Sequence, residues 1–591
     1  MTSGSPADAS ARWRAAGRAL VGKMLAELAF EEVLRPAPGA GPQDWSVTLA
    51  GGAEYRFRAR RGAFGAWRVE EGSVVRAAEG STQAAEDPLR LALDARGDLG
   101  LSGPDTAEVV RELTSTQAAD AHLLAAGRTA AELADMPYVE LESQGAGHPC
   151  IILNKGRMGF SAADAGGYAP EAARPLRLRW IAVHPDLAST AGVDGLDHDA
   201  LLTRELGDEE RRRLGAPLAG RAGAEAYRWL PVHPFHWDEA VAPLFAGEIA
   251  QGRMVPLGEG SDRYRPLQSV RTLTNVDAPD RFDVKTTLMV RNTLVWRGLD
   301  HRATAAAPVV TSWLLKVREG DPYLRDECRI ALLGEVASAV VRHPVLDAIP
   351  DAPYRYHELL GAVWRQPVAS WLEPGERART MAALLSVGSD GRALVAELVA
   401  RSGLPADEWL RRLLAALLRP LLHYLVRHGV AFCPHGENTV VLYDERDVPV
   451  RVAIKDFAED VNLLPGRLPE YADLPPAADE VLLRWEPRQL RHSILSAVFV
   501  GHFRFMTDLL ERHLGVAEEA FWAMVRDELV AYPARFPELA DRFEQFELTA
   551  PAFERVCLNR EHLLGGEFHD RSERDAEFDV MHGRVASPLA A

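Results

Sequence analysis

Three features are scarce in this sequence: cysteine, positive charge relative to negative charge, and long apolar runs. The four cysteines are far apart and lack metal-binding or redox spacing, which favours a reduced cytoplasmic setting. The net charge of -18 argues against nucleic acid or an anionic membrane as a general partner. No apolar run approaches about 18 residues and the N-terminus has no hydrophobic signal segment, so we expect neither membrane spanning nor export.

The remaining composition is ordinary for a globular protein, with 47% hydrophobic, 26% charged and 7% aromatic residues. At 591 residues the chain is long for one hydrophobic core, which favours two or three domains. Strand-like and helical patterns predict an α+β fold, with an N-terminal α+β domain over residues 1–165, a central β-rich domain over 166–375 and a mainly helical domain over 376–591. In the last of these, leucines at helical spacing across Glu408–His428 predict a core helix.

The most informative stretch is GVAFCPHGENTVVLYDERDVPVRVAIKDFAED at residues 429–460. Its pattern predicts a loop carrying His435 and Asn438, then a strand, a polar turn and a second strand that ends just before Asp456. Because a hairpin brings the end of its second strand beside the start of its first, Asp456 is expected near Asn438 and His435. An amide and a carboxylate in this arrangement can hold Mg²⁺ against nucleotide phosphates. The imidazole can donate a hydrogen bond to a phosphate or substrate oxygen.

This arrangement is similar to the Asn and the Asp-Phe of a kinase active site, with one part missing. Kinase-like enzymes carry a catalytic Asp in the loop ahead of the Asn. Here Glu437 immediately precedes Asn438, and His435 occupies the loop. From this stretch alone, a capped loop and an ordinary hairpin remain an equally good interpretation.

A second candidate is GHPCIILNKGRMGFS at residues 147–161. Lys155 and Arg157 are two positions apart, so they can point the same way from an extended segment, and Gly156 and Gly159 let a ligand approach the backbone. The two cations suit a di- or tricarboxylate or a phosphate, with the Arg157 guanidinium offering a two-pronged contact. A solvated basic turn is the alternative.

A third candidate is a polar set within residues 251–299, a region whose pattern predicts antiparallel strands. The set comprises Ser269, Arg271, Thr272, Lys285, Thr293 and Arg297. Ser269 and Arg271 would share one strand face, and Lys285 interrupts a β-prone run, which calls for an acidic or phosphate partner. Three cations among hydroxyls on adjacent strands would form an anion-binding wall. A solvent-exposed polar face of a sheet is the alternative.

Taken together and in this order, these motifs resemble the IucA/IucC (aerobactin-type) family. The motifs are GHPCIILNKGRMGFS with YAPE, LPVHP, the SVRTLT strand with its downstream Lys, Thr and Arg, and HGEN followed by KDF. Members of that family are siderophore synthetases that work independently of non-ribosomal peptide synthetases, and the resemblance covers roughly residues 140–560. Many members have a second His-Pro where this chain has Ile151-Ile152, and Gln in place of Glu437, which leaves substrate identity open.

The resemblance implies an ATP- and Mg²⁺-dependent ligase that activates one carboxylate of citrate, or of a related polycarboxylate, as an acyl-adenylate. The acyl group then passes to an amine, a hydroxylated diamine, an amino acid or an alcohol, with release of AMP and pyrophosphate. It also implies a three-domain shape like a cupped hand, with thumb-like, fingers-like and palm-like parts in the order given above. The C-terminal domain would be distantly kinase-like, and the protein would be a homodimer.

The resemblance implies a role for each residue of this chain that matches one of the family's motifs. The groups implied to bind ATP are Ser269, Arg271, Thr272, Lys285, Arg297, His435, Glu437, Asn438 and Asp456, of which Asn438 and Asp456 also serve Mg²⁺. The groups implied to act at the α-phosphate and the reacting carboxylate are Arg297, Thr293, His435 and Lys285. The groups implied to bind the carboxylate substrate are His148, Lys155, Arg157 and Thr293.

Two other classes of protein are consistent with parts of this inventory. A small-molecule kinase would use the same Mg²⁺ corner, but it needs a general base for an incoming hydroxyl and would release ADP. A non-catalytic nucleotide-binding protein would keep the fold while losing a charged site residue, whereas all the cations and Asp456 are present here. We therefore favour the ligase.

Overall fold

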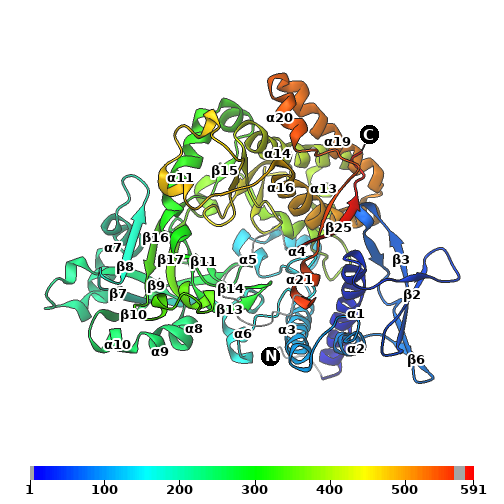
Figure 1. Ribbon diagram of the computed structural model, residues 1–591, viewed down its shortest axis with the longest axis horizontal. Coiled ribbons are helices and arrows are strands. Elements are labelled where there is room, and N and C mark those ends of the chain that lie inside the picture. The colour runs from blue at the N-terminus through cyan, green and yellow to red at the C-terminus, as the bar shows by residue number, and fades with distance from the viewer. Residues whose placement is uncertain (1–5, 565–579, 591) are drawn as a thin grey trace.

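The computed structural model describes residues 6–564 and 580–590 and has a mixed α+β fold, as predicted (Figure 1). A six-stranded sheet lies near the N-terminus, an eight-stranded sheet follows, and a four-stranded sheet lies among the helices of the C-terminal part. Figure 1 shows the first sheet at the right, the large sheet at the left and the helical part above both.

The N-terminal sheet folds against the first helix because its central strand alternates apolar and charged side chains. Tyr55, Phe57 and Ala59 are buried on one face of β3, and the arginines between them point the other way. Helix α1 (Pro6–Phe30) packs on this layer and on α3. The elements are β1 (Ala37–Pro38), β2 (Asp44–Thr48), β3 (Glu54–Arg61), β4 (Trp67–Val69), β5 (Val75–Ala78), β6 (Ser81–Ala84), α2 (Pro88–Asp94), α3 (Gly103–Ala126), α4 (Ala130–Asp135) and α5 (Tyr138–Glu142).

The eight-stranded sheet is antiparallel throughout and has the order β8-β16-β17-β12-β11-β10-β7-β9. Helix α11 (His301–Gly320) packs on β16 and β17, and α7 (His198–Leu214) packs on β10. Strand β12 lies near the middle and is buried along its length, although it carries Lys285. The strands are β7 (Leu176–Val183), β8 (Ala188–Gly192), β9 (Arg228–Val232), β10 (Met254–Pro266), β11 (Thr272–Asn275), β12 (Asp283–Thr286), β16 (Glu335–Val341) and β17 (Leu360–Arg365).

The antiparallel strands predicted in residues 251–299 are present, but two details were wrong. Ser269 and Arg271 do not share a strand face, because they lie in a turn that the backbone N–H groups of Leu267 and Val270 help to close, with Val270 at φ 69°. The later strands also leave the large sheet: β13 (Leu288–Asn292) and β14 (Val295–Arg297) form a separate two-stranded sheet, and Arg291 of β13 also forms an isolated bridge with Met158. The polar set is therefore divided between two sheets.

The C-terminal part is built around helix α14 (Ala406–Arg427), whose leucine stripe is buried as predicted. This helix packs on β21 and on α19, so the four-stranded sheet, of order β15-β21-β20-β18, has a helical cover. The elements are β15 (Ala331–Leu332), β18 (Arg377–Thr380), α13 (Leu394–Ser402), β20 (Thr439–Tyr443), β21 (Pro449–Ile454), α18 (Arg504–Leu514) and α19 (Glu518–Arg535).

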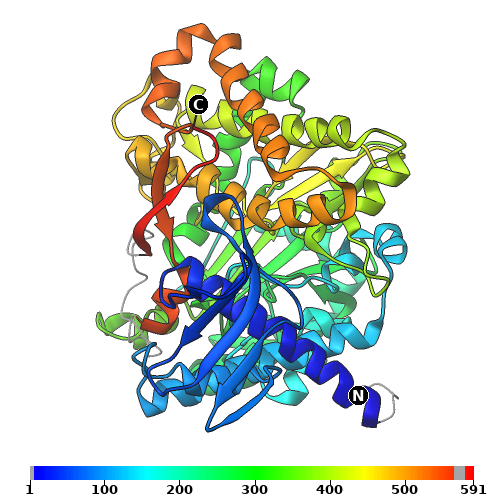
Figure 2. The same cartoon turned by 90° about the vertical axis from the view of Figure 1, so that its right-hand side faces the viewer.

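The end of the described chain returns to the N-terminal part. Helix α21 (Leu558–Leu564) packs on α1, and the Asn559 amide donates to Glu31 at 2.7 Å while its oxygen accepts from the Ile152 N–H at 2.9 Å. Figure 2 shows the red C-terminal strands beside the blue N-terminal sheet. The remaining elements are α6 (Ala162–Tyr168), α8 (Pro234–His236), α9 (Ala242–Leu244), α10 (Ala246–Ala250), α12 (Tyr354–His357), β19 (Val430–Ala431), β22 (Asn462–Leu463), α15 (Pro476–Asp479), β23 (Leu483–Arg484), α16 (Pro487–Leu490), α17 (His492–Ile494), α20 (Ala540–Gln545), β24 (Ala552–Val556) and β25 (Met581–Ala586).

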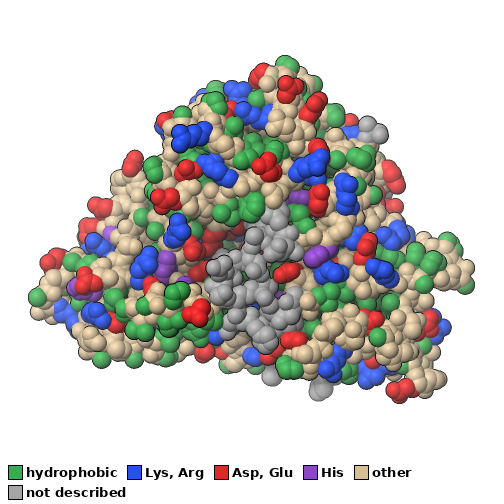
Figure 3. Space-filling view, viewed as in Figure 1, with side chains coloured by type: hydrophobic (Ala, Val, Ile, Leu, Met, Phe, Trp, Pro, Cys, Tyr) green, Lys and Arg blue, Asp and Glu red, His purple; other side chains and the backbone are tan. Residues whose placement is uncertain are grey.

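One helical stretch among the described residues, Pro487–Leu514, has the length and composition of a membrane span, with a mean hydropathy of 1.2. However, 67% of its apolar window is buried inside the protein, which is the position of a core helix. On the face shown in Figure 3, basic and acidic side chains are interspersed without a large area of one sign.

Candidate active site

One large cavity, of about 1020 Å³, collects the side chains that the sequence motifs singled out. It is lined by all thirteen predicted site residues: His148, Lys155, Arg157, Ser269, Arg271, Thr272, Lys285, Thr293, Arg297, His435, Glu437, Asn438 and Asp456. They come from three segments of the chain that are more than 100 residues apart in sequence. Their convergence on one concave surface marks a candidate active site, and the role of each residue stays a prediction.

The hairpin β20–β21 places its loop and its exit as expected. Thr439 lies opposite Ile454, and the Lys455 N–H donates to the Asn438 carbonyl at 3.1 Å. Asp456 therefore emerges beside the loop that carries His435 and Asn438. The two oxygen-bearing side chains face different partners, however, because the Asn438 amide donates to Asp460 Oδ2 at 3.0 Å.

Asp456 belongs to a compact network of opposite charges. Its Oδ1 lies 3.5 Å from Lys285 Nζ and 3.4 Å from the Arg365 guanidinium. Lys285 Nζ also lies 3.4 Å from Glu459 and 3.7 Å from Glu335. Lys285 therefore has acidic neighbours, one of the two kinds of partner that its place in a β-prone run predicted.

The protonation states in this network depend on two opposing effects: burial disfavours the charged form of each group, and neighbours of opposite charge favour it. Burial opposes ionisation of Asp456, but Lys285 and Arg365 hold its pKa well below the usual range. Burial likewise opposes the charge of Lys285, yet Asp456 and Glu459 raise its pKa. Burial raises the pKa of Glu335, with a smaller contribution from Asp456. The cavity therefore presents an ionised carboxylate beside a protonated amine.

The tip of hairpin β13–β14 holds Thr293 and Leu294 in left-handed backbone conformations, with φ of 49° and 80°. A two-residue turn with both φ values positive normally takes Asn or Gly, because side chains branched at Cβ are strained there. Strain of this kind concentrates at functional sites. It brings the Thr293 hydroxyl to the Arg297 guanidinium, which donates a hydrogen bond to it.

Glu112 on α3 holds the same hairpin through an ion pair with Arg291 of β13. Glu112 accepts from Arg291 at 2.7 Å and its other oxygen lies 3.0 Å from His562 Nε2 on α21. Burial raises the pKa of Glu112, but His562 and Arg291 outweigh burial and hold it below the usual value. The ionised carboxylate thus fixes β13, and with it the position of Arg297, against the N-terminal part.

His435 is oriented by its own loop. Its Nδ1 accepts from the backbone N–H groups of Glu437 at 3.2 Å and Asn438 at 3.3 Å. The ring proton therefore lies on Nε2, which leaves a donor for a ligand oxygen. Burial lowers the pKa of His435, so the donor is a neutral imidazole at pH 7. Burial also lowers the pKa of His148, to about 3.

Lys155 and Arg157 differ from the prediction in their geometry. They do not extend side by side from a strand, because the segment turns and Arg157 has φ 45°. Both are buried around Glu171: Arg157 donates to it through two bonds of 2.7 and 2.8 Å, and Lys155 Nζ lies 3.7 Å away. Lys155 also donates to Asp120 at 2.7 Å. The two cations thus reach the cavity already partly neutralised.

Replacing Glu171 with glutamine is expected to lower the free energy of unfolding by about 3 kcal/mol, because the change leaves two buried cations with one fewer negative partner. Burial opposes the charge of Glu171, but Arg157 and Lys155 lower its pKa from 4.5 to about 2. Its stabilisation is therefore complete above pH 4.5 and is lost as the pH falls toward 2. Denaturant unfolding should show a larger difference between wild type and Glu171→Gln at pH 7 than at pH 3.

The control is Glu259→Gln, whose side chain is 60% exposed and 3.9 Å from Arg177. That change should alter stability by less than about 0.5 kcal/mol at either pH. Equal stability of wild type and Glu171→Gln at pH 7 would contradict the proposed neutralisation.

Sequence reasoning missed several charged residues of the site. Glu459 contacts Arg271 at 3.3 Å as well as Lys285, and Asp460 accepts from Asn438. The sequence did contain a clue to these two acids, because both lie within four residues after Asp456 in the same motif. Glu335 and Arg365 carried no such signal, because they lie on β16 and β17 and reach the network only through sheet pairing.

Comparison with known proteins agrees with this reading. The model of the IucA / IucC family matches residues 137–386, and a model described as ferric iron reductase FhuF-like transporter matches residues 407–569. The chain is 35% identical to the rhizobactin siderophore biosynthesis protein RhbF of Rhizobium meliloti (strain 1021), over 98% of this chain and 96% of that protein. It is 30% identical to the citryl-spermidine/3,4-dihydroxybenzoyl-citryl-spermidine:spermidine ligase of Bacillus anthracis, over 72% of this chain and 70% of that protein.

Among solved structures, the aerobactin synthetase IucC from a hypervirulent pathotype of Klebsiella pneumoniae has a TM-score of 0.86 at 31% identity, covering 98% of each chain. The fold, the cavity and these relatives define a ligase of siderophore biosynthesis. The chain belongs to the IucA/IucC family, as its motifs indicated. The FhuF-like match is a similarity of the C-terminal part, a region that the match to RhbF also includes.

Proposed function

We propose that this enzyme uses ATP to convert one carboxylate of citrate, or of a related polycarboxylate, into an acyl-adenylate, and then joins the acyl group to an amine or alcohol. The observation that supports this reaction is the set of fixed cations, Arg271, Lys285 and Arg297, on the same cavity as the Asp456 carboxylate. Attack of a carboxylate on a phosphate brings two anions together, and preorganised cations stabilise the charge that develops. The citryl group in the name of the Bacillus relative supports the choice of acid.

The phosphates of ATP would lie against the part of the cavity that is lined by residues at β11 and β12. Thr272 and Lys285 are register partners on these strands, and the Thr272 N–H donates to the Ser269 hydroxyl at 3.2 Å. Arg271 is held between Glu459 and the Gly298 carbonyl, to which it donates. Two hydroxyls and two cations thus surround one edge of the cavity, which suits an anion with several oxygens.

Asn438 and Asp456 would hold Mg²⁺, with Glu437, Glu459 and Asp460 lining the same corner of the cavity. The donor set fits, because Mg²⁺ prefers hard oxygen ligands and keeps phosphate oxygens and water. The hydrogen bond to Asp460 uses the amide nitrogen of Asn438, which is not a metal ligand, and the amide oxygen is retained as a donor atom. When bound, the ion supplies positive charge to the phosphates.

Arg297, Thr293 and His435 would act where the two reactants meet. The guanidinium adds charge for the α-phosphate and the reacting carboxylate, and Nε2–H of His435 donates to one of their oxygens. The remaining carboxylates of the acid would contact His148, Lys155 and Arg157. Since Glu171 already holds the two cations in place, they are preorganised and lose little freedom when the acid binds.

We also propose the three-part, cupped-hand organisation over residues 1–165, 166–375 and 376–591, with a distantly kinase-like C-terminal part. It is supported by the cavity lining, which draws on each part: His148 to Arg157 from the first, Ser269 to Arg297 from the second, and His435 to Asp456 from the third. A cytoplasmic homodimer is the proposed working form, and size-exclusion chromatography with light scattering tests the dimer.

The reaction predicts a trapping experiment. An acyl-adenylate is a mixed anhydride, so a strong small nucleophile that enters the cavity should intercept it. We expect citrate, ATP, Mg²⁺ and hydroxylamine to yield a citryl hydroxamate with equal amounts of AMP and pyrophosphate, measured by mass spectrometry and a pyrophosphate assay. Other di- and tricarboxylates should be compared in parallel, because Ile151-Ile152 and Glu437 stand where many family members differ.

The other outcomes are distinct. ADP with a phosphorylated product would identify a kinase and overturn the ligase proposal. No consumption of ATP with any polycarboxylate, with or without an amine, would identify a non-catalytic nucleotide-binding protein. Omitting the acid is the matched control, and it should abolish formation of AMP.

A further inference from the structure

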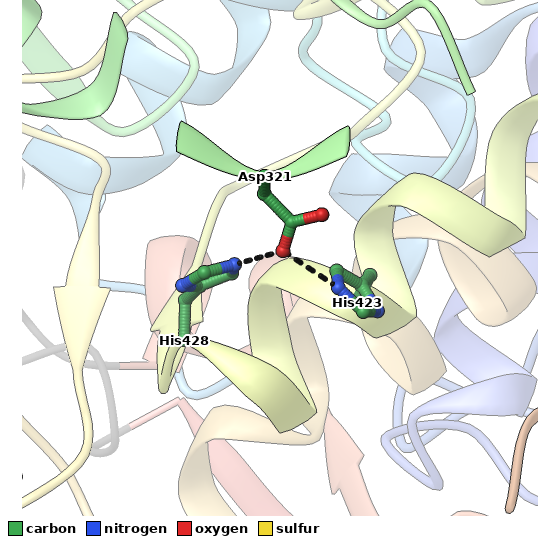
Figure 4. Close-up of side chains that lie close together, drawn as sticks. All are labelled: Asp321, His423 and His428. Carbon is green, nitrogen blue, oxygen red and sulfur yellow. Dashed lines mark hydrogen bonds and ion pairs between the residues drawn. The ribbon is translucent and has the colours of Figure 1, made fainter. Parts of the chain in front are cut away.

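A second cluster of ligand-type side chains lies outside the cavity, at the point where two long helices end (Figure 4). Asp321 is the C-cap of α11, and His428 is the C-cap of α14, with His423 five residues earlier in the same helix. Asp321 Oδ2 lies 2.9 Å from Nε2 of His423 and 2.9 Å from Nε2 of His428. Figure 4 shows both imidazoles directed at this one oxygen.

The separations are close to those of a metal site. A tetrahedral Zn²⁺ with bonds of about 2.0–2.1 Å holds its ligand atoms roughly 3.3 Å apart. The oxygen-to-nitrogen distances need to grow by only a few tenths of an ångström to admit such an ion. All three ligand atoms lie within 4.8 Å of one another.

Two of the three ligands are already oriented by neighbours. Asp321 Oδ1 accepts from the backbone N–H groups of Tyr323 at 2.9 Å and Leu324 at 3.3 Å, which turns Oδ2 toward the imidazoles. Nδ1 of His423 lies 2.9 Å from the Tyr532 hydroxyl. A hydroxyl can donate to Nδ1 or accept from Nδ1–H, so Tyr532 suits either tautomer, including the one that leaves Nε2 for a metal.

Helix ends and solvent exposure both bear on a cation at this point, and each helix also carries one arginine, Arg318 or Arg427, in its last turn. Two helices, of 20 and 22 residues, direct their C-terminal, partially negative ends at this point. The side chains of Asp321 and His428 each remain 14% exposed, whereas His423 is 3% exposed. An ion held here would therefore have protein ligands on its inner side and water on its outer side.

We propose that Asp321, His423 and His428 form a binding site for one divalent transition-metal ion of the Zn²⁺ type. Two imidazole nitrogens and one carboxylate oxygen suit such ions, whereas Mg²⁺ selects oxygen ligands. The ion would join the end of α11 to the end of α14. Because α14 leads through β19 into the loop that carries His435, the site fixes the base of that loop and is separate from the proposed ATP and Mg²⁺ site.

The test is titration of the full chain, freed of any affinity tag, with Zn²⁺ in the presence of saturating Mg²⁺. Calorimetry should show one site per chain, and Co²⁺ should bind with the visible absorption spectrum of mixed nitrogen and oxygen ligation. Asp321→Asn keeps an oxygen for the two backbone N–H groups but loses the ligand oxygen. It and His428→Gln should each weaken Zn²⁺ binding at least about 100-fold. Tyr532→Phe should weaken it about 10-fold, as expected for a partner of a ligand.

Two controls locate the site. His122→Gln removes an exposed histidine of α3, and Asp456→Asn alters the cavity, so neither should change the affinity for Zn²⁺. The proposal is overturned if wild type binds no Zn²⁺, or if Asp321→Asn and His428→Gln bind as wild type does. Circular dichroism of each variant separates loss of the site from loss of the fold. If Asp321→Asn misfolds, the Zn²⁺ affinities of His428→Gln and Tyr532→Phe decide whether the site exists.

Discussion

Replacing Asp456 with asparagine is expected to lower turnover at least about 100-fold while the fold is retained, because a neutral amide is a poorer ligand for Mg²⁺. The carboxylate is held ionised beside Lys285 and Arg365 at the exit of β21. Steady-state rates at saturating ATP, measured across a range of Mg²⁺ concentrations, check the expectation. The Mg²⁺ requirement should rise together with the loss of rate.

Asp456 also neutralises buried cations, so a second variant separates this effect from metal binding. Glu335 contacts the same Lys285 at 3.7 Å, is 3% exposed and is absent from the cavity lining. Glu335→Gln should therefore perturb the charge of Lys285 without changing the Mg²⁺ requirement. Asp473→Asn, at a side chain 68% exposed, is the surface control. A near-normal rate of Asp456→Asn at saturating Mg²⁺ would refute its role.

Replacing Arg297 with alanine is expected to cost about 2–4 kcal/mol of transition-state stabilisation, by analogy with the removal of one preorganised donor from a charged centre. If Arg297 acts where charge develops, the loss should fall mainly on kcat. Arg271→Ala should instead raise the KM for ATP, since that guanidinium would bind a phosphate in the ground state. Initial rates with varied ATP and varied citrate distinguish the two patterns.

Arg297→Lys is the matched variant, since it keeps the charge but loses the planar fork that reaches Thr293. Its rate should lie between those of wild type and Arg297→Ala. Unchanged kcat/KM in Arg297→Ala or in Arg271→Ala would remove that residue from the mechanism. Thermal unfolding of each variant shows whether the hairpin β13–β14 is still folded.

The local structure around the site was predictable where a short-range rule applied. The strands and turn of residues 439–454 follow from strand-like runs and a polar turn, and antiparallel pairing of the two strands then brings Asp456 back beside the 435–438 loop. The leucine stripe of α14 is a similar case, because 3.6-residue periodicity decides which face is buried. Motif order was sufficient to indicate the family, which the comparisons show.

Short-range rules failed where a distant segment supplied the partner. Lys155 and Arg157 look like a free cationic pair in the sequence, but Glu171 and Asp120 approach them from other segments and neutralise much of their charge. Ser269 and Arg271 look like neighbours on a strand face, but the left-handed Val270 places them in a turn. Neither outcome is encoded in the spacing of the residues concerned.

The amino-acid sequence was enough to predict the class of fold, the cations and carboxylates of the site, and the family. Each depends on composition, periodicity or motif order, which are visible along the chain without knowledge of its three-dimensional contacts. Which charges meet, as Lys285 meets Asp456, Glu459 and Glu335, became clear from the folded structure alone. The same holds for the helix ends that converge at Asp321 and His428. The physical reason is that the pKa of a group and its fitness as a ligand depend on charges and burial within a few ångströms, and those neighbours come from segments far apart in the chain.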